Sequence, residues 1–455
     1  MAGSRATFGV ELPVDLTGRP KRAGLEHELR EAVREGRLAS GTRLPSSRTL
    51  AKDLGIARNS VAEAYGQLVA EGWFVTRHGA GTWVADRVGP EAAAERAGDP
   101  RPMRFDLRPG VPDLGAFPRS AWLAAARRAL AVAAHDAFGY GDPRGLPVLR
   151  EALAEYLVRA RRVVASPERI VVVAGFAQGL ELLCAVLRAR GARTLAVEAH
   201  GHRLHRGIAE ASGLAVRNLA VDGDGAVIAA LDDTGAALLT PAHQFPLGVA
   251  LAPDRRRQAV TWAAHTGAIL IEDDYDGEFR YDRQTVGAMQ SLAPGHVVYA
   301  GTAAKSLAPG LRLGWLVPPA TLIDEVVEAK RARGAFANTL DQLTLAEFLS
   351  AGAFDRQVRR ARLAYSRRRE RLLATLAGRV ELSGIAAGLH AVAHLPGGDE
   401  QEVVSRAARE HGLALQGLGA FTAAGHERAP ALVIGYGTPP EHAYSSALAR
   451  LSAVL

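Results

Sequence analysis

Lysine is nearly absent from this chain. Of its 55 basic residues only Lys21, Lys52, Lys305 and Lys330 are lysines, and the others are arginines. Arginine replaces lysine well as a surface charge, but it cannot form a Schiff base with an aldehyde. A lysine inside a specialised loop is therefore a candidate for covalent chemistry. Lys305 stands in such a loop, 301–314, which follows an apolar run and is punctuated by glycine.

Cysteine and long uncharged apolar runs are also missing. Cys184 is the only cysteine, which excludes a disulfide within the chain. It lies in the apolar run 180–187, where a buried thiol is expected rather than a nucleophile. No uncharged run is long enough to span a bilayer, and no basic-then-apolar leader opens the sequence. We therefore expect a cytoplasmic protein with no membrane segment.

The length and composition indicate a globular protein of more than one domain. The 455 residues exceed one ordinary core, and the hydrophobic content of 48% is typical of globular chains. The net charge of +7 permits nucleic-acid binding without establishing it. Residues 86–104 combine alanine, glycine, proline and charge without apolar periodicity, so we predict a linker there. It would separate a domain over 1–85 from a larger one over 105–455.

The first domain has the pattern of a winged helix-turn-helix. Leu25, Leu29 and Val33 recur at helical spacing, and a second helix is expected to begin after Pro45. A third helix is expected over 57–71. Two short strands, 73–77 and 82–84, are joined by a glycine-rich hairpin, 78–81. Three helices and a hairpin in fewer than ninety residues predict a DNA-binding domain of this type.

Polar residues open the third helix, which would enter the major groove. Arg58 can pair with guanine, Asn59 with adenine, and Ser60 with a base or a phosphate. Four positive charges against one negative give residues 43–60 a net charge of +3. A small helical domain with a solvated basic face is the alternative. Further predicted DNA contacts are Arg43, Ser46, Ser47 and Arg48 near the second helix and His78 and Gly79 at the hairpin tip.

The second domain alternates apolar strands with helices. This rhythm predicts an α/β fold with a mainly parallel sheet covered on both faces. We expect strands at 170–173, 194–197, 236–239, 268–271, 297–299 and 314–317, helices at 178–190, 254–266 and 320–333, and a long helical stretch over 339–377.

The aldehyde cofactor that best explains Lys305 is pyridoxal 5′-phosphate. Its pyridine nitrogen needs a carboxylate, for which we predict Asp273, at the end of an apolar strand where ligands bind in open α/β sheets. Tyr275 would donate to the ring hydroxyl. A surface lysine is the alternative explanation for Lys305, and a solvated or metal-binding acidic loop is the alternative for 272–276. We predict no metal site.

The remaining cofactor contacts are predicted around the phosphate and the ring. The strand, glycine turn and helix start over 171–179 form a phosphate cradle, with Phe176, Ala177 and Gln178 at the helix start. Thr302 and Arg312 would add a hydroxyl and a charge. Further candidates are His202, which could stack on the ring, His243 or Gln244 at the ring edge, and Tyr140 as a phosphate ligand that could reach across a dimer.

Both domains resemble known families. The segment 41–51, together with Tyr65, Leu68 and Glu71-Gly72, resembles the GntR-type DNA-binding domain. This resemblance covers about residues 19–85. The order of phosphate turn, stacking residue, ring-edge loop, acid strand and lysine loop resembles a fold type I aminotransferase domain over 105–455. Their combination, with the phrases 243–246, 272–276 and 305–314, resembles the MocR/GabR regulators. The resemblance implies homodimers whose larger domains pair head-to-tail while the smaller ones read DNA.

The sequence departs from the family pattern at three positions. His202 stands where an aromatic ring is common, and His200 stands where a proline is expected. Val433 occupies the place of the arginine that holds a substrate carboxylate in aminotransferases, and Arg428 is only close to it in sequence. Without that clamp an amino acid loses a main orienting contact.

We therefore expect a transcriptional regulator rather than an enzyme. It would bind pyridoxal phosphate through a Schiff base to Lys305, respond to the cofactor or to an amine or amino acid that reacts with it, and act on a double-stranded DNA operator. The alternatives are a pyridoxal-phosphate-dependent aminotransferase with a fused DNA-binding domain, and a regulator whose larger domain serves only dimerisation.

Overall fold

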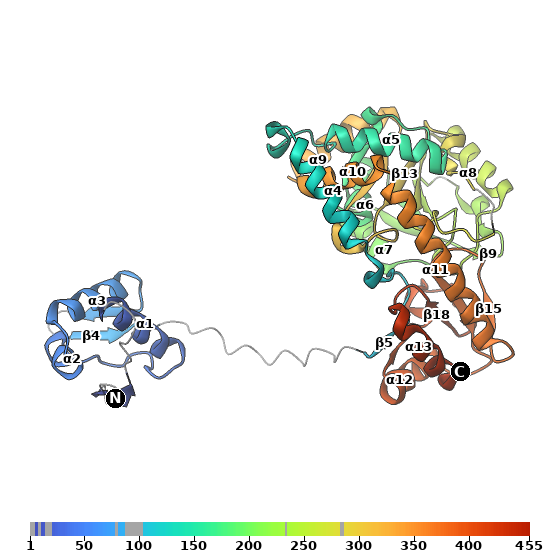
Figure 1. Cartoon of the computed structure of the whole chain (residues 1–455). Helices are drawn as coiled ribbons and strands as arrows, with labels where there is room; N and C mark the ends of the chain where they lie inside the picture. Colours follow the sequence, from blue (N-terminus) through green and yellow to red (C-terminus); the bar gives the residue numbers. More distant parts are fainter. Residues whose placement is uncertain are drawn as a thin grey trace. The chain divides into compact units, whose positions relative to one another are not determined.

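The chain folds into two compact units, residues 1–101 and 102–455 (Figure 1). The computed structural model describes residues 5–7, 11–13, 21–77, 81–86, 103–232, 234–282 and 286–455. The predicted contacts His78 and Gly79 lie outside the described residues, as does most of the predicted linker 86–104. No helix in these described ranges is long and apolar enough to cross a membrane.

The N-terminal unit contains three helices and a two-stranded wing. Ser46 accepts a hydrogen bond from the Thr49 amide at 3.1 Å and so caps the second helix, and Gly55 ends it with a left-handed φ of 64°. A short hairpin of β1 (Arg5–Thr7) and β2 (Glu11–Pro13) was not predicted. The other elements are α1 (Lys21–Arg34), α2 (Ser47–Leu54), α3 (Arg58–Ala70), and the antiparallel strands β3 (Phe74–Arg77) and β4 (Gly81–Val84).

One apolar cluster holds this unit together. Leu25 and Leu29 of α1 are buried with Leu68 of α3, and Tyr65 meets Phe74 edge to face at 5.8 Å. The predicted core residue Val33 is only partly buried, because Ala32 takes the inward position on the last turn of α1. The three helices therefore share one core with the base of the wing.

The C-terminal unit is built on a seven-stranded sheet with the order β6-β14-β13-β12-β11-β7-β8. All neighbouring strands are parallel except β14, which is antiparallel to both β13 and β6. The prediction of a mainly parallel sheet is thus confirmed. The strands are β6 (Val171–Val173), β7 (Thr194–Glu198), β8 (Ala215–Leu219), β11 (Ala236–Leu239), β12 (Ile269–Asp274), β13 (Val297–Thr302) and β14 (Gly314–Val317).

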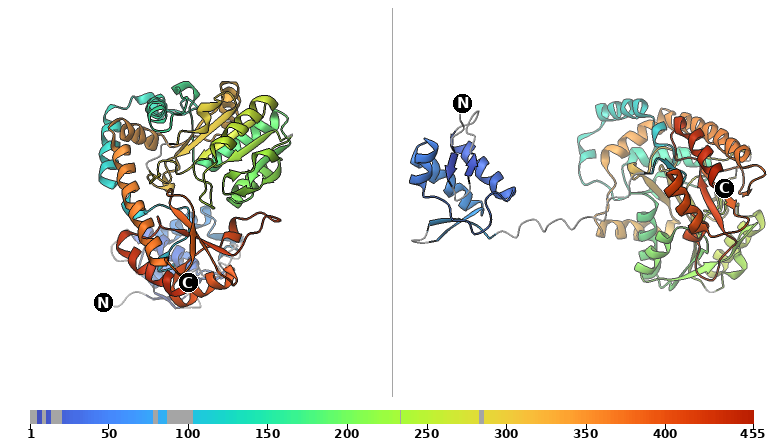
Figure 2. Two further views of the ribbon diagram at one scale, coloured as in Figure 1. Left: turned by 90° about the vertical axis from the view of Figure 1, so that its right-hand side faces the viewer. Right: turned by 90° about the horizontal axis from the view of Figure 1, so that it is seen from below.

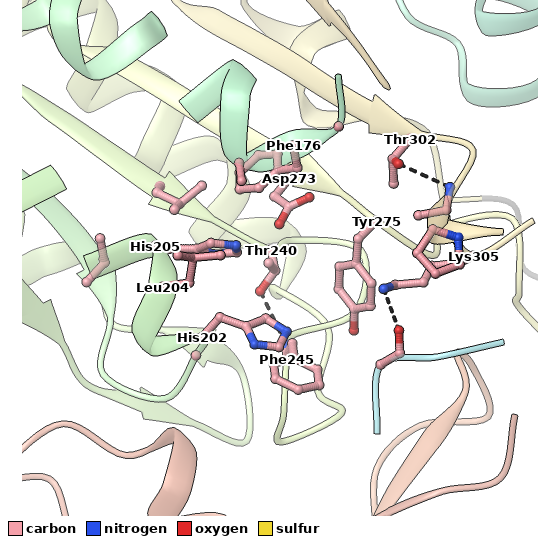
Figure 3. Close-up of a pocket in the computed structure, with 18 of the residues that line it drawn as sticks. Phe176, His202, Leu204, His205, Thr240, Phe245, Asp273, Tyr275, Thr302 and Lys305 are labelled. Atoms are coloured by element: carbon pink, nitrogen blue, oxygen red, sulfur yellow. Dashed lines mark hydrogen bonds between the residues drawn. The ribbon is translucent and has the colours of Figure 1, made fainter. Parts of the chain in front are cut away.

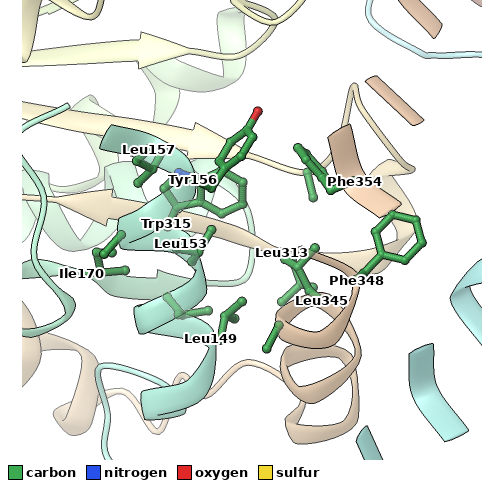
Figure 4. Close-up of a cluster of buried hydrophobic side chains, with 14 of the residues drawn as sticks. Leu149, Leu153, Tyr156, Leu157, Ile170, Leu313, Trp315, Leu345, Phe348 and Phe354 are labelled. Atoms are coloured by element: carbon green, nitrogen blue, oxygen red, sulfur yellow. The ribbon is translucent and has the colours of Figure 1, made fainter. Parts of the chain in front are cut away.

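Helices cover both faces of this sheet (Figure 2). Trp315 and Val317 of β14 point into a cluster with Leu153 and Phe348 (Figure 4), whereas Leu316 points into a separate cluster on the other face. This alternation is the period of two expected of a strand buried on both sides. The helices are α4 (Arg119–Val132), α5 (Pro147–Arg161), α6 (Phe176–Ala189), α7 (Arg203–Ala211), α8 (Pro253–Thr266), α9 (Ile323–Ala332), α10 (Thr339–Ser350) and α11 (Ala353–Leu376).

The predicted helical stretch 339–377 consists of two helices rather than one. α10 ends at Ser350, and Gly352 takes a left-handed φ of 64° before α11 begins. Glycine adopts this conformation without the steric cost that other residues meet. The break lets α10 pack against α4 and α5, while α11 runs on toward the end of the chain.

A smaller antiparallel sheet closes the C-terminal unit. It contains β15 (Glu381–Ser383), β16 (His390–His394) and β18 (Ala431–Gly435), and it packs against α11 and α13 (Glu441–Val454). The chain enters the unit beside this sheet, because β5 (Phe105–Asp106) pairs in parallel with β17 (Leu413–Ala414). The remaining helix, α12 (Glu400–His411), precedes β17.

A buried ion pair fixes the end of β12, where the acidic loop begins. Arg161 donates to both carboxylate oxygens of Asp274, at 2.6 and 2.9 Å, and both side chains are buried. Tyr299 of β13 donates to the same carboxylate at 2.8 Å. Because successive side chains of a strand point to opposite faces, Asp273 faces the other side of the sheet from Asp274.

We predict that Arg161→Met destabilises the C-terminal unit strongly. The substitution leaves the Asp274 carboxylate buried without its cation, a change that typically costs about 3–5 kcal/mol. Tm measured by differential scanning calorimetry should fall by about 10 °C. The control Arg257→Met removes the exposed pair Arg257–Asp254 and should leave Tm unchanged. Equal Tm values for the two variants would contradict the prediction.

Candidate functional site

A cavity of about 280 Å³ lies at the carboxyl ends of the central strands (Figure 3). Its wall is formed by the ends of β7, β11, β12 and β13, the start of α6 and the loop after β13. This is where ligands bind in open α/β sheets. Of the residues predicted to bind the cofactor, the cavity brings together Lys305, Asp273, Tyr275, Arg312, Thr302, Phe176, Ala177 and His202.

Lys305 projects into the cavity from the loop after β13. Its ammonium group donates a hydrogen bond to the carbonyl oxygen of Gly110 at 2.6 Å. Burial lowers the pKa of Lys305, and the carboxyl groups of Asp273 and Asp276 partly oppose that shift. A lowered pKa increases the fraction of neutral amine, which is the form that attacks a carbonyl carbon.

Asp273 lies across the cavity at the end of β12 and is only 6% exposed. Burial raises the pKa of its carboxyl group well above the ordinary value, although the nearby Lys305 amine opposes the shift. Among the described residues no hydrogen-bond donor reaches this carboxyl group. Asp273 is therefore available to a positively charged N–H of a bound ring.

An anion-binding corner is formed by the N-terminus of α6 and the guanidinium group of Arg312. Gly175 precedes α6 with a φ of 89°, and a Cβ atom there would lie 3.3 Å from that guanidinium group. Arg312 forms no ion pair with any residue in the described ranges. The free helix amides and this unpaired cation together suit a phosphate.

Two predicted phosphate ligands, Gln178 and Thr302, use their side chains in hydrogen bonds that stabilise the loops around this corner. The Gln178 side chain accepts a hydrogen bond from the Ala174 amide at 2.8 Å and does not line the cavity. The Thr302 hydroxyl donates to the Leu313 carbonyl at 3.2 Å and accepts from the Ala304 amide at 3.1 Å. Thr302 thus shapes the turn that carries Lys305, while still lining the cavity.

His202 lies on the cavity wall opposite Lys305 (Figure 3). Its ring stacks on Phe245 with centroids 4.3 Å apart and an angle of 8° between the planes. Burial and the nearby Lys305 lower the pKa of His202 to about 4, so the imidazole is neutral near pH 7. A neutral flat ring backed by Phe245 can pack against an aromatic ligand.

Three further predicted residues do not line the cavity of this chain. The His243 side chain contacts Asp276 instead, with Nδ1 2.8 Å from the carboxylate. Phe245, from the same loop, lines the cavity in its place. Gln244 is likewise occupied, donating to the carbonyl oxygens of His200 and Phe245. Tyr140 is 95% exposed on the surface and does not line this chain's cavity.

Several cavity residues were not predicted from the sequence. One of them is Glu198 at the end of β7, whose carboxyl group accepts hydrogen bonds from Thr240 and Gln244. Burial raises the pKa of Glu198 to about 7. The reasoning that identified Asp273, an acid at the carboxyl end of a buried strand, applies equally to Glu198. Phe245 and His205 carried no comparable signal.

Among the described residues, the cavity offers no free cation where an amino acid would place its carboxylate. Val433 is fully buried in β18 and packs in a cluster with Phe245 and Phe421. Arg428 points elsewhere and donates to the Val221 carbonyl. Arg206 lines the cavity, but its guanidinium group is hydrogen-bonded to the carbonyl oxygens of Glu198 and Ala199.

A second candidate site lies on the N-terminal unit. Arg58 and Asn59 are exposed at the start of α3, next to the partly buried Ser60. The arginines of α1 form ion pairs with glutamates (Arg22, Arg30 and Arg34), whereas Arg43, Arg48, Arg58 and Arg77 form none within the described ranges.

The wing and the second helix also contribute polar groups. The guanidinium groups of Arg43 and Arg77 lie over the Trp83 ring, 5.8 and 5.0 Å from its centre. Ser47 is partly buried and Arg48 is exposed at the start of α2, while the Ser46 hydroxyl is occupied in capping that helix. Unpaired cations at a helix N-terminus and on a wing are suited to the DNA backbone.

The comparisons agree with both halves of this description. Residues 21–84 match the gntR family of bacterial regulatory proteins, and residues 105–432 match the family of class I and II aminotransferases. The probable rhizopine catabolism regulatory protein MocR of Rhizobium meliloti is 34% identical over 87% of this chain and 85% of its own length. The pyridoxine biosynthesis transcriptional regulator PdxR of Corynebacterium glutamicum is 33% identical over 94% of each chain.

Solved structures of similar fold include aminotransferases. An archaeal alanine:glyoxylate aminotransferase aligns with a TM-score of 0.70 at 24% identity, covering 77% of this chain and 90% of that one. At this identity the likeness establishes the fold of the larger unit and not its activity. With a gntR-type DNA-binding unit, an aminotransferase-like unit and regulators as full-length relatives, the chain belongs to the MocR/GabR-type transcriptional regulators.

Proposed function

We propose that this regulator binds pyridoxal phosphate through a Schiff base to Lys305 and changes its binding to a double-stranded DNA operator in response. The observation that carries the proposal is the arrangement of three groups around one cavity: the Lys305 amine, the Asp273 carboxyl group and the unpaired Arg312 guanidinium group at the start of α6. When bound, the cofactor supplies an aldehyde that condenses with an amine.

Each of these groups suits one part of the cofactor. Asp273 would accept from the protonated pyridine nitrogen, which would keep the Asp273 carboxyl group ionised despite its burial. Arg312 and the amides of Phe176 and Ala177 would hold the phosphate. His202 would pack against one ring face. These contacts fix the aldehyde beside Lys305.

The effector we propose is pyridoxal phosphate itself, or an amine that condenses with it. An amino-acid effector is disfavoured because Val433 replaces the usual arginine and Arg206 is committed to carbonyl oxygens. The relative PdxR is named a regulator of pyridoxine biosynthesis, which supports cofactor sensing. A homodimer is proposed from the family, and it would place two recognition helices on one operator.

Lys305→Ala tests the covalent step. Without the amine no Schiff base forms, so the variant should lose the visible absorbance of bound cofactor and the label fixed by borohydride reduction. Peptide mass spectrometry should locate that label on Lys305 in the wild-type protein. The matched control Lys330→Ala removes a lysine whose amine is hydrogen-bonded to the Pro143 and Val172 carbonyls, and it should keep the label. A label that persists in Lys305→Ala rejects the proposal.

An aminotransferase with a DNA-binding unit is the second candidate function, since Lys305, Asp273 and Arg312 are all present. We expect no catalytic turnover when the purified protein is incubated with pyridoxal phosphate, an amino-acid donor and a keto acid. The reason is that Arg312 is assigned to the cofactor phosphate and Arg206 is bonded to carbonyl oxygens, so the described cavity lining leaves no free guanidinium group for a substrate carboxylate. Sustained formation of the new amino acid, measured by chromatography, would establish the enzyme instead.

Arg58→Ala tests the reading of DNA by α3. Loss of a guanidinium group that pairs with a base should weaken operator binding by about 1–3 kcal/mol, or roughly tenfold or more. Gel shifts with the DNA upstream of the gene itself would measure the change. Arg37→Ala is the matched control, because Arg37 belongs to neither α2 nor α3 nor the wing and is paired with Glu35. Unchanged binding by Arg58→Ala would exclude Arg58 from the interface.

A further inference from the structure

A buried chain of three polar residues continues from the cavity behind Tyr275. The Tyr275 hydroxyl lies 3.1 Å from Nδ1 of His243, and the same Nδ1 atom lies 2.8 Å from Oδ2 of Asp276. His243 and Asp276 are each only 2% exposed. Only Tyr275 of the three lines the cavity, where it stands beside Lys305 (Figure 3).

Tyr275 and Asp276 both contact Nδ1 of His243, but this atom can either donate a hydrogen or accept one, and not both. A carboxylate can only accept, so the Asp276 contact requires that Nδ1 carries a hydrogen and donates it. An Nδ1 atom with a hydrogen cannot accept the proton of the Tyr275 hydroxyl. The other ring nitrogen of His243, Nε2, is buried and has no hydrogen-bond partner in the described residues, which suits a bare acceptor rather than an N–H.

Tyr275 itself retains its proton. Burial, followed by the charges of Asp276 and Asp273, raises the pKa of this phenol well above its ordinary value. The proton is therefore present on Tyr275 and is not accepted by His243. Asp276 also contributes to that raised pKa through a hydrogen bond with Tyr275, but its carboxylate is shared with Nδ1 of His243, so the proton can pass to an oxygen on a ligand ring in the cavity.

We propose that Asp276 is a positioning residue that locks His243 in its Nδ1–H tautomer and thereby reserves the Tyr275 hydroxyl proton for an oxygen on the ligand ring. This inference rests on the proposed function, because the ring oxygen is the hydroxyl of pyridoxal phosphate. It assigns a role to two residues that do not touch the ligand.

The surroundings of His243 fit a tautomer lock better than a metal site. His243, Asp276 and His390 have ligand atoms within 4.8 Å of one another. However, His390 donates through Nε2 to the Pro246 carbonyl at 3.0 Å, and Asp276 is already bonded to His243. The backbone of Gly388 is packed so closely that a Cβ atom would lie 2.2 Å from the His243 ring and 2.5 Å from Asp276.

Replacement of Asp276 by asparagine should reverse the proton arrangement. An asparagine side chain is neutral, so it no longer holds the hydrogen of His243 on Nδ1 as a carboxylate does, and the Nε2–H tautomer becomes accessible. Nδ1 then becomes an acceptor and competes for the Tyr275 proton. The ligand ring oxygen loses its donor although Tyr275 is still present.

The test compares two ligands that differ only at that oxygen: pyridoxal phosphate and 3-deoxypyridoxal 5′-phosphate. Equilibrium dissociation constants are measured by fluorescence for the wild type, Asp276→Asn, Tyr275→Phe and the double variant. Asp276→Asn and Tyr275→Phe should each weaken pyridoxal phosphate binding by about tenfold, the loss of one hydrogen bond, and the double variant should be no weaker than either. Binding of the deoxy ligand should be unchanged in all three.

Two further variants separate the lock from a general loss of structure. Asp224→Asn alters an exposed carboxylate and should bind both ligands as the wild type does. His243→Leu added to Asp276→Asn removes the competing acceptor and should restore binding of pyridoxal phosphate. Tm of every variant shows that it is folded.

Three results would overturn the inference: equal weakening of both ligands by Asp276→Asn, no weakening of either, or stoichiometric zinc in the purified protein that is lost with Asp276→Asn. A wild-type protein that binds neither ligand would instead refute the proposed function.

Discussion

Lys305 and Asp273 line the same cavity, where burial disfavours the charged form of each. Burial lowers the pKa of the amine and raises the pKa of the carboxyl group, and the attraction between the two opposes both shifts. The cavity thus holds two groups whose charged forms depend on each other. A ligand with a protonated ring nitrogen would relieve this dependence, because it gives Asp273 a cation of its own and leaves the Lys305 amine free to react.

Charge is concentrated at a few points of an otherwise neutral cavity. Burial lowers the pKa of His202 to about 4 and that of His205 to about 3, so neither imidazole adds a positive charge near pH 7. Arg206 lines the wall, but its donors are used by main-chain carbonyls. The proposed selectivity for a ligand without a free carboxylate follows from this distribution rather than from the volume of the cavity.

Much of this arrangement could be predicted because strand ends are readable in a sequence. Asp273 follows an apolar run that is typical of a buried strand, and Lys305 follows the next such run along the chain. His243 could not be placed in the same way: the segment after β11 is irregular, and spacing alone does not decide whether His243 or Phe245 faces the cavity. The break at Gly352 was missed because apolar residues recur on both sides of it, and β8 was missed because its residues are only partly buried.

The carbonyl of Gly110 gives the Lys305 amine a structural connection beyond the cavity. Gly110 lies just after β5, the first strand of the C-terminal unit, and β5 is the part of that unit nearest in sequence to the DNA-binding unit. An ammonium group has three hydrogens to donate, whereas a nitrogen bonded to a carbonyl-derived carbon would keep at most one. The proposed reaction at Lys305 would therefore weaken the hydrogen bond to the Gly110 carbonyl. Its first effect on the backbone would fall near β5, the strand that follows the DNA-binding unit in sequence.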